Sequence, residues 1–302
     1  MGQETSVRPE PFFIVGMQRS GTTMLRLMLN AHGSLCVPFE SGFIQGVYKD
    51  LPKYGDLSVR ENAAACLADI SQRDMPKRGK LIEDPERVLA HEIRGYGDLV
   101  RAIFEEYAKQ RGKLRWGDKT PTHVVDLDLL WSLFPGCRVI HLVRDGRDVA
   151  LSLLATEWGS NNLLRIADDW RWKTLLGHKM GAFLGEQYLE IRYEDLVVDT
   201  EGNLRQICDF LQEPYDENML LYHTSAESEM PAESLKWHRT SVSRPDPNKI
   251  GMWKSRMSLS DRILFEQVAG DELQLFGYPT EKHPPTIGSK IKKVYYCLWN
   301  RY

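Results

Sequence analysis

The stretch Phe12-Phe13-Ile14-Val15-Gly16-Met17-Gln18-Arg19-Ser20-Gly21-Thr22-Thr23 decides the fold. Its first four residues form an apolar run that is typical of a strand buried on both faces of a parallel sheet. A loop with two glycines follows, and residues 24–30 then place apolar side chains at helical spacing. Glycines let the backbone turn so that successive N–H groups point inward, and the start of the next helix adds partial positive charge. The sequence therefore predicts an anion-binding loop between a strand and a helix.

The two glycines of this loop, Gly16 and Gly21, have the spacing of the phosphate loop G-x-x-x-x-G-K-[ST], but Thr22 stands in the place of the lysine. In nucleotide triphosphatases that lysine and Mg²⁺ together neutralise a triphosphate. The cation in this loop is Arg19 instead, so the loop is better matched to a less charged ligand, such as a single bridging phosphate. A glycine-rich turn that only caps a helix is the alternative, and the preceding buried strand counts against it.

A second motif, VIHLVRDGRDVALS, spans residues 139–152. Arg144 follows the strand expected at 138–143, where open α/β sheets place their ligands. Ser152 lies eight residues on, two turns into a helix expected at 145–155. Arginine offers a fork of donors to a phosphate, and serine offers a hydroxyl. A turn with a solvated cluster of ion pairs is the alternative, but together the two motifs imply two phosphate sites for one nucleotide.

The rest of the chain alternates strand and helix patterns, which predicts a parallel sheet covered on both faces. Further strands are expected at 34–39, 114–116 and 188–192, and further helices at 58–71, 97–110, 122–133, 161–183, 200–211 and 260–276. Residues 230–250 are rich in Pro, Ser, Arg and Lys with weak periodicity. We interpret them as a long functional or mobile loop.

The amino-acid composition limits the classes of protein to which this chain can belong. The 302 residues are 42% hydrophobic and 27% charged, with a net charge of -3, which excludes a disordered chain and argues against a globally basic nucleic-acid binder. The five cysteines are scattered without a CxxC pair, which indicates reduced thiols in a cytoplasmic protein rather than zinc or disulfides. No signal peptide and no transmembrane run is expected. The final stretch GSKIKKVYYCLWNRY mixes lysines and aromatics; packing onto the domain is favoured over contact with a membrane or partner.

Taken together, the motifs resemble those of the sulfotransferases that use 3'-phosphoadenosine 5'-phosphosulfate (PAPS) and release PAP. The resemblance covers about residues 12–280. The loop formed by Arg19, Ser20, Gly21, Thr22 and Thr23 resembles the family's 5'-phosphosulfate loop, and the pair Arg144 and Ser152 resembles its 3'-phosphate site. The resemblance implies a P-loop NTPase-like three-layer α/β/α fold with a central parallel sheet. We expect one sulfotransferase domain at residues 10–280 and a basic, aromatic tail at 281–302.

The chain is most similar to the branch of that family with the tyrosylprotein sulfotransferases and many bacterial relatives. That resemblance assigns the catalytic base to Glu40, a lysine in a K-[DTS]-P turn to Lys119, and a tyrosine near the nucleotide to Tyr193 in Tyr-Glu-x-Leu. The segment at 233–250 resembles the one that closes over PAPS, with Arg239 and Lys249 as phosphate contacts. Two arginines of the tyrosylprotein enzymes are replaced here, by Gly42 and Thr156, and the first change puts a peptide-tyrosine acceptor in doubt.

These residues predict sulfuryl transfer from PAPS to an alcohol or phenol. Glu40 would take the acceptor proton, while Lys119 and Arg19 would stabilise charge on the sulfuryl group and the leaving phosphate without a metal ion. His123 is a rival base, and His141 is interpreted as structural. A P-loop kinase or other nucleotide phosphotransferase, or a non-catalytic PAP-binding protein, is the alternative function. A homodimer is compatible with the sequence.

Five tryptophans could line an acceptor pocket or stack on adenine, although core packing is expected for most: Trp116, Trp131, Trp158, Trp170 and Trp172.

Overall fold

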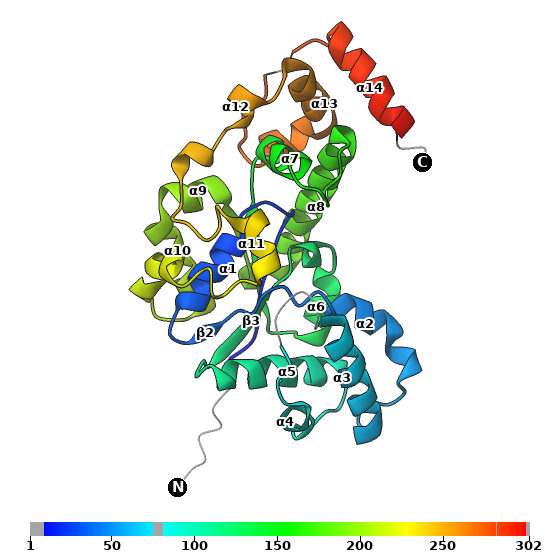
Figure 1. The fold of residues 1–302 in the computed structure, drawn as a ribbon, viewed down its shortest axis with the longest axis vertical. Helices are drawn as coiled ribbons and strands as arrows, with labels where there is room; N and C mark the ends of the chain where they lie inside the picture. The colour runs from blue at the N-terminus through cyan, green and yellow to red at the C-terminus, as the bar shows by residue number, and fades with distance from the viewer. Residues whose placement is uncertain (1–8, 75–80, 282, 300–302) are drawn as a thin grey trace.

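The protein is built around a five-stranded sheet, as seen in a computed structural model that describes residues 9–74, 81–281 and 283–299 (Figure 1). Every strand pair is parallel, and the strand order is β2-β3-β1-β4-β5. The strands are β1 (Phe12–Val15), β2 (Leu35–Cys36), β3 (Arg115–Lys119), β4 (Arg138–Val143) and β5 (Tyr188–Arg192). β1 lies in the middle, so the loop that follows it leaves from the centre of the sheet's carboxyl edge.

Alternate residues of the strands point to opposite faces of the sheet, and both faces are covered. Phe13 and Val15 pack with one set of helices, and Phe12 and Ile14 pack with another. The first face carries α2 (Ile44–Asp50), α3 (Arg60–Asp74), α5 (Tyr96–Gln110), α6 (Leu127–Leu133) and part of α8 (Leu163–Leu184), and the second carries α1 (Thr22–Ala31), α9 (Tyr193–Val198), α10 (Thr200–Leu211) and the 3-10 helix Glu217–Thr224. The predicted three-layer α/β/α fold with a central parallel sheet is confirmed.

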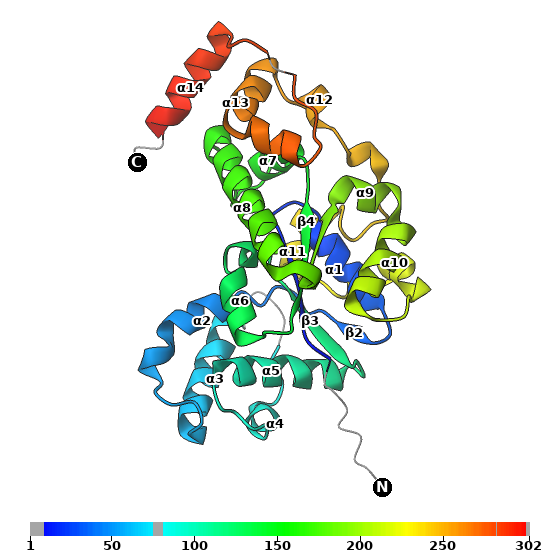
Figure 2. The same ribbon diagram turned by 180° about the vertical axis from the view of Figure 1, so that it is seen from behind.

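A third apolar cluster lies beyond the end of β4. Figure 2 shows the helices that contribute to it, together at one end of the molecule. The cluster contains residues of α7 (Gly146–Leu154), α8, α12 (Trp253–Arg256) and α13 (Leu259–Leu275). The remaining helices are α4 (Pro85–Leu89), α11 (Ala232–His238), α14 (Ile287–Trp299) and the 3-10 turns Leu51–Lys53, Pro121–Val125, Gly185–Gln187 and Pro247–Lys249. Within the described parts of the chain, no helix has the length and apolarity needed to cross a membrane.

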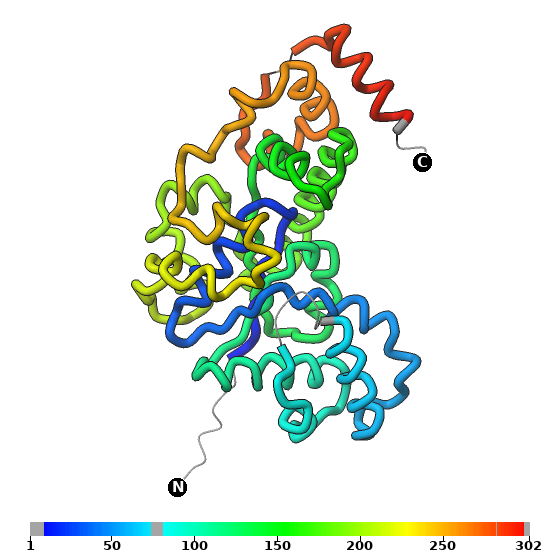
Figure 3. The backbone as a smooth tube through the Cα atoms, viewed as in Figure 1, coloured from blue at the N-terminus to red at the C-terminus, as the bar shows by residue number. Residues whose placement is uncertain are grey.

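The structure corrects the predicted boundaries at four places. The strand predicted at 34–39 has only the two residues of β2, because the Val37 N–H donates to the Asn30 side chain and Pro38 has no N–H to donate. The strand predicted at 114–116 runs to Lys119, so that lysine belongs to the strand itself. The helix predicted at 122–133 is broken at Asp126 into the 3-10 turn Pro121–Val125 and α6. Residues 230–250 are not an irregular loop throughout, because they contain α11, and this segment runs beside α1 (Figure 3).

Candidate active site

The loop between β1 and α1 has the backbone geometry that its glycines predicted. Gly21 caps α1 with a φ of 93°, and a β-carbon there would lie 2.4 Å from the Tyr193 ring. Gly16 has a φ of 151°, and its β-carbon would meet the Leu142 carbonyl at 2.4 Å. Arg19 also adopts a positive φ, 72°, which is costly for a residue with a side chain. The neighbouring strand and helix therefore hold this loop in a conformation that aims the first N–H groups of α1 into the space above it.

Lys119 ends β3 directly beside that loop, and its side chain is completely buried. Its ammonium donates a hydrogen bond to Thr23 Oγ1 at 3.2 Å and forms an ion pair with Glu40. Burial lowers the pKa of the Lys119 ammonium, and the Glu40 carboxylate opposes part of that shift. The Glu40 side chain is 29% exposed and borders the cleft described below. The structure thus joins the predicted base to a predicted cation.

Arg144 and Ser152 reach the same loop from β4 and α7. Arg144 donates to the carbonyl oxygens of Arg19 at 3.1 Å and Lys249 at 3.2 Å, and its guanidinium lies 4.4 Å from the centre of the Tyr193 ring. Arg19 Nε donates to Ser152 Oγ at 2.9 Å. Burial and the nearby Arg144 charge lower the pKa of Arg19, although the Glu40 carboxylate acts in the opposite direction. Two guanidiniums that repel each other at the edge of a cleft form a site that an anion would stabilise.

The other charged residues of the RDGRD motif have a structural role. Arg147 is fully buried and donates to Asp145 and to Glu266, at 2.8 and 2.7 Å for the shortest contacts. Asp148 accepts hydrogen bonds from the backbone N–H groups of Gly251 at 2.7 Å and Trp253 at 2.8 Å. Arg147 therefore belongs to an ion-pair cluster, as the alternative interpretation of the RDGRD motif had it, except that the cluster is buried rather than solvated. Arg144 does not belong to this cluster.

A cleft of about 460 Å³ brings these motifs together. Predicted site residues that line it are Arg19, Gly21, Thr22, Thr23, Glu40, Arg144, Ser152 and Tyr193. Lys119 and Ser20 are buried behind this wall. Of the two predicted contacts in the closing segment, Arg239 is exposed and outside the lining, and Lys249 contributes its carbonyl to Arg144.

Sequence reasoning missed the cleft residues of the closing segment: Ser234, Trp237, His238, Thr240 and Ser241. The spacing of Ser234, Trp237, His238 and Ser241 is three, one and three, which is the spacing of one helix face, and it was available as a signal. Burial, together with the positive charges of Lys119 and Arg19, lowers the pKa of His238 to about 4. That imidazole is therefore neutral at physiological pH and can accept a proton. Trp158 also lines the cleft, whereas Trp116 and Trp170 are core residues.

The closing segment is fastened at both ends to the elements that carry the site. At its start, the buried Arg26 of α1 donates to the carbonyl of Glu229 at 3.0 Å and to that of Val37 at 2.9 Å. At its end, the backbone at Gly251 is held by Asp148 of α7. The segment between Met230 and Ile250 therefore spans from one phosphate motif to the other across the cleft.

His123, the rival base, lies outside the cleft lining and is buried between two carboxylates. Its ring nitrogens lie 3.4 Å from Asp118 and 3.9 Å from Asp126. Burial acts to lower the pKa of His123, but the two carboxylates outweigh it and raise the pKa to about 9. A histidine that is already protonated at neutral pH cannot serve as a general base. His141 is structural as expected, since it is buried in β4 against Tyr188 and Glu190.

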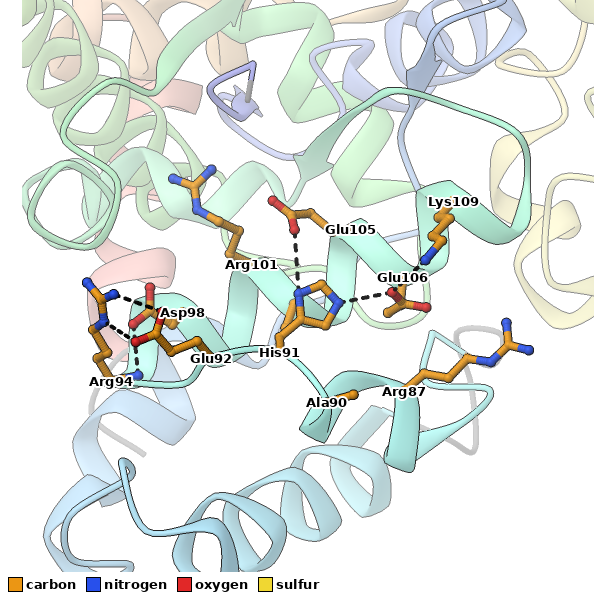
Figure 4. A pocket seen from close by; sticks show the side chains of 11 residues that line it. Arg87, Ala90, His91, Glu92, Arg94, Asp98, Arg101, Glu105, Glu106 and Lys109 are labelled. Carbon is orange, nitrogen blue, oxygen red and sulfur yellow. Dashed lines mark hydrogen bonds and ion pairs between the residues drawn. The ribbon is translucent and has the colours of Figure 1, made fainter. Parts of the chain in front are cut away.

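A wider concavity of about 700 Å³ lies over α4 and α5, away from these motifs (Figure 4). Its charged side chains pair with one another: His91 lies 3.0 Å from Glu106 and 3.8 Å from Glu105, and Arg94 lies 2.8 Å from Glu92. This pairing leaves no concentration of one sign of charge, unlike the cleft beside the loop. In the described ranges, no group of three or more His, Cys, Asp or Glu side chains is arranged to hold a metal ion.

Comparison with known proteins is consistent with this geometry. The sequence profile of the sulfotransferase family matches residues 11–217. The chain belongs to the sulfotransferase family. It is 24% identical to protein-tyrosine sulfotransferase A of Caenorhabditis elegans over 296 residues, which cover 95% of this chain and 72% of that enzyme. It is 26% identical to an uncharacterized protein of Aquifex aeolicus (strain VF5) over 265 residues, 85% of this chain but only about a third (32%) of that protein's length.

The sulfotransferase fold is also shared with solved structures. The sulfotransferase domain of the Synechococcus PCC 7002 olefin synthase superposes with a TM-score of 0.60 at 24% identity, covering 89% of this chain and 94% of that domain. The family match contains Arg19, Glu40, Lys119, Arg144 and Tyr193, but it ends before α11. The closing segment is thus the part of the cleft wall outside the matched residues.

The buried His123 predicts a pH dependence of stability. Its pKa of about 9 exceeds the ordinary value near 6.5, so its stabilising contribution is complete below about pH 6.5 and is lost as the pH rises through about 9. The free energy of unfolding of the wild type, measured in urea from pH 6.5 to 9.5, should fall by on the order of 3 kcal/mol more than that of His123→Gln.

The control is His283→Gln, which replaces a histidine paired with Glu281 at the surface rather than in the core, and its profile should stay far closer to that of the wild type than the profile of His123→Gln does. Parallel profiles for the wild type and His123→Gln would show that His123 does not carry this charge.

Proposed function

We propose that this sulfotransferase moves a sulfuryl group from PAPS to the hydroxyl of an alcohol or phenol, giving PAP and a sulfate ester. The observation that carries the proposal is the convergence of two phosphate motifs and an acidic residue on one cleft. Arg19 and the threonines of the loop line one part of it, Arg144 and Ser152 another, and Glu40 borders the space between α1 and the closing segment.

In this proposal the loop amides, Thr22 and Thr23 bind the 5'-phosphate, and Arg144 and Ser152 bind the 3'-phosphate. The close approach of Arg19 to both Ser152 and the Arg144 charge supports a dianionic or trianionic ligand there, because bound phosphate would relieve the repulsion between the guanidiniums. Tyr193 already stacks against Arg144, so it fixes the guanidinium on one side and borders the cleft on the other.

The transfer itself uses the buried ion pair. The acceptor oxygen attacks sulfur, its proton passes to the Glu40 carboxylate, and the bond between sulfur and the 5'-phosphate oxygen breaks. Once Glu40 is protonated, Lys119 loses its counter-charge and becomes available to stabilise the sulfuryl oxygens, while Arg19 neutralises the leaving phosphate. The 5'-phosphosulfate at which the reaction occurs carries less charge than a triphosphate, so protein cations can replace a metal ion there.

His238 is a second candidate base, supported by its position in the cleft lining and its lowered pKa. It approaches from the closing segment, opposite the strand that carries Lys119, and its ring packs edge-on against Phe39 at 6.4 Å. A neutral imidazole here could take the proton or orient the acceptor hydroxyl. Glu40 remains our assignment because it is paired with the cation that the reaction needs.

The acceptor is expected to differ from an acidic peptide tyrosine. Gly42 lines the cleft with a φ of 62°, so the position that carries an arginine in the tyrosylprotein branch has no side chain here. Phe39, Trp158 and Trp237 contribute aromatic surface to the same cleft. This wall suits a ring-bearing or apolar acceptor better than a run of carboxylates.

The 3'-phosphate assignment predicts how binding of PAP responds to substitution. Arg144→Ala should weaken PAP binding by about 1.5–3 kcal/mol because a charge-assisted hydrogen bond is lost, and Ser152→Ala should cost about 1 kcal/mol. Calorimetric titration with PAP and with 5'-AMP measures both effects. Arg171→Ala, on the exposed side of α8, is the matched control and should leave both affinities unchanged. An equal loss for 5'-AMP and PAP in Arg144→Ala would contradict the assignment.

The base assignment predicts a selective loss of turnover. Glu40→Gln keeps the size of the side chain and an amide oxygen that can still accept a hydrogen bond from Lys119, but it cannot take up the acceptor proton, so kcat should fall about 10²–10⁴-fold with PAP affinity nearly unchanged. His238→Asn is measured beside it, with an alkyl alcohol and with an acidic phenol as acceptors. The loss in Glu40→Gln should be smaller for the phenol, which gives up its proton readily. Near-normal turnover in Glu40→Gln with a large loss in His238→Asn would move the base to the histidine.

Independence from metal ions is the third expectation for this site. Activity measured after exhaustive treatment with EDTA should stay within about twofold of the untreated enzyme, since a catalytic metal would supply several kcal/mol. Recovery only on adding Mg²⁺, together with turnover of ATP, would favour the P-loop kinase or nucleotide phosphotransferase. Binding of PAP with no sulfated product across a broad panel of acceptors would favour a non-catalytic PAP-binding protein.

A further inference from the structure

The C-terminal helix α14 presents an apolar face to solvent. Four aliphatic side chains, spaced by four, three and four residues, form this outer face and are all more than half exposed: Ile287 (79%), Ile291 (65%), Val294 (61%) and Leu298 (56%). That spacing places them in one narrow stripe along the helix. Tyr295, 54% exposed, borders the stripe. Both ribbon views draw α14 at one end of the molecule beside α13, with its far side open (Figures 1 and 2).

The opposite side of α14 is fixed to the body of the protein by polar contacts. Lys292 Nζ lies 2.8 Å from both carboxylate oxygens of Asp261 in α13. The carbonyl of Tyr296 accepts a hydrogen bond from Asn162 Nδ2 at 3.0 Å, and Ser289 is buried. Rotating the helix to hide its aliphatic stripe would break these contacts. The outer face is therefore held outward. The expectation that this segment packs its aromatics on the domain holds for Tyr296, which is partly buried, but not for Tyr295, and the side chains of Trp299 and Tyr302 lie outside the described part of the chain.

The charged residues that the sequence places on α14 itself are all positive. From Lys282 to the C-terminus the sequence has five Lys or Arg residues and no Asp or Glu, in a protein whose net charge is -3. Lys290 is exposed beside the stripe and Lys293 is exposed farther round the helix, and neither forms an ion pair with another described residue. A helix with a narrow apolar stripe and lysines outside it has the pattern of helices that lie in the interface of a bilayer. At 13 residues it is about 20 Å long, too short to cross a bilayer core of about 30 Å.

We propose that α14 lies flat on an anionic lipid bilayer, with its outer face inserted among the acyl chains and its lysines among the acidic headgroups. Charge complementarity selects this partner over a second copy of the chain. Two copies that met through this face would bring like-charged lysines together, and four aliphatic residues are far fewer than the roughly 20–30 residues a side of a stable interface. An anionic membrane can bury the apolar stripe among its acyl chains and attract the lysines of α14 to its acidic headgroups.

Vesicle sedimentation of the full chain tests the proposal. The wild type should pellet with phosphatidylcholine vesicles containing about 30% phosphatidylserine, and at least about tenfold less with pure phosphatidylcholine. Raising the salt from about 0.1 to about 0.5 M should release it, because the attraction is screened. Protection of α14 amides from hydrogen exchange on adding the anionic vesicles is the second readout.

Two variants separate the apolar and electrostatic parts of the binding. Ile291→Ser with Leu298→Ser, and separately Lys290→Gln with Lys293→Gln, should each reduce binding to the anionic vesicles by about tenfold or more. The matched controls replace exposed residues of the same types elsewhere, Val198→Ser with Leu221→Ser and Lys49→Gln with Lys109→Gln, and should bind like the wild type. Wild-type protein that stays in the supernatant, or equal losses in the control variants, would overturn the proposal. So would a lipid-free dimer that becomes monomeric in Ile291→Ser with Leu298→Ser, because the face would then cover a second copy.

Discussion

A lysine ammonium with no exposed surface is the constraint on which the site depends. Burying an isolated ammonium is costly, so Lys119 is stable only where a carboxylate and a hydroxyl meet it. Glu40 comes from the loop after β2, and Thr23 comes from the first turn of α1. The Lys119 Nζ atom therefore joins three parts of the fold: the end of β3, the loop after β2 and the start of α1. Moving any of the three would leave a buried charge without its partner.

The two arginines of the RDGRD motif, Arg144 and Arg147, have different surroundings although they are only three residues apart. Arg147 points into the protein, where Asp145 and Glu266 neutralise it and the network braces α7 against α13. Arg144, three residues earlier, leaves the end of β4 and contributes an additional positive charge beside Arg19. Arg147 is thus neutralised inside the fold, whereas Arg144 and Arg19 bring two closely spaced guanidiniums to the cleft, where the proposed function assigns them to an anionic ligand. The same strand-to-helix turn therefore carries one arginine neutralised in the core and one at the cleft.

Much of the fold was predictable because the apolar runs of β1 and β4 and the helical periods around them are local signals. The same holds for the loop at 16–23, for Arg144 and for Ser152. β3 was predicted too short, since Asp118 and Lys119 are charged yet buried, with Ser41 and Glu40, which are distant in sequence, as partners. α11 was not predicted because only Leu235 of this short helix packs against a core cluster, while Ser234, Trp237 and His238 line the cleft, so its apolar periodicity is weak. The rejection of His123 as base likewise needed its two carboxylate neighbours, which only the folded chain brings together.

The double fastening of the closing segment has an evolutionary consequence. Arg26 fixes its start and Asp148 fixes its end, and both anchors belong to elements that the sheet itself positions. Insertions, deletions and substitutions between residues 231 and 249 can therefore reshape one wall of the cleft while the strands and the phosphate motifs stay where they are. Under the proposed function, such changes would alter the acceptor while leaving the residues assigned to the nucleotide in place.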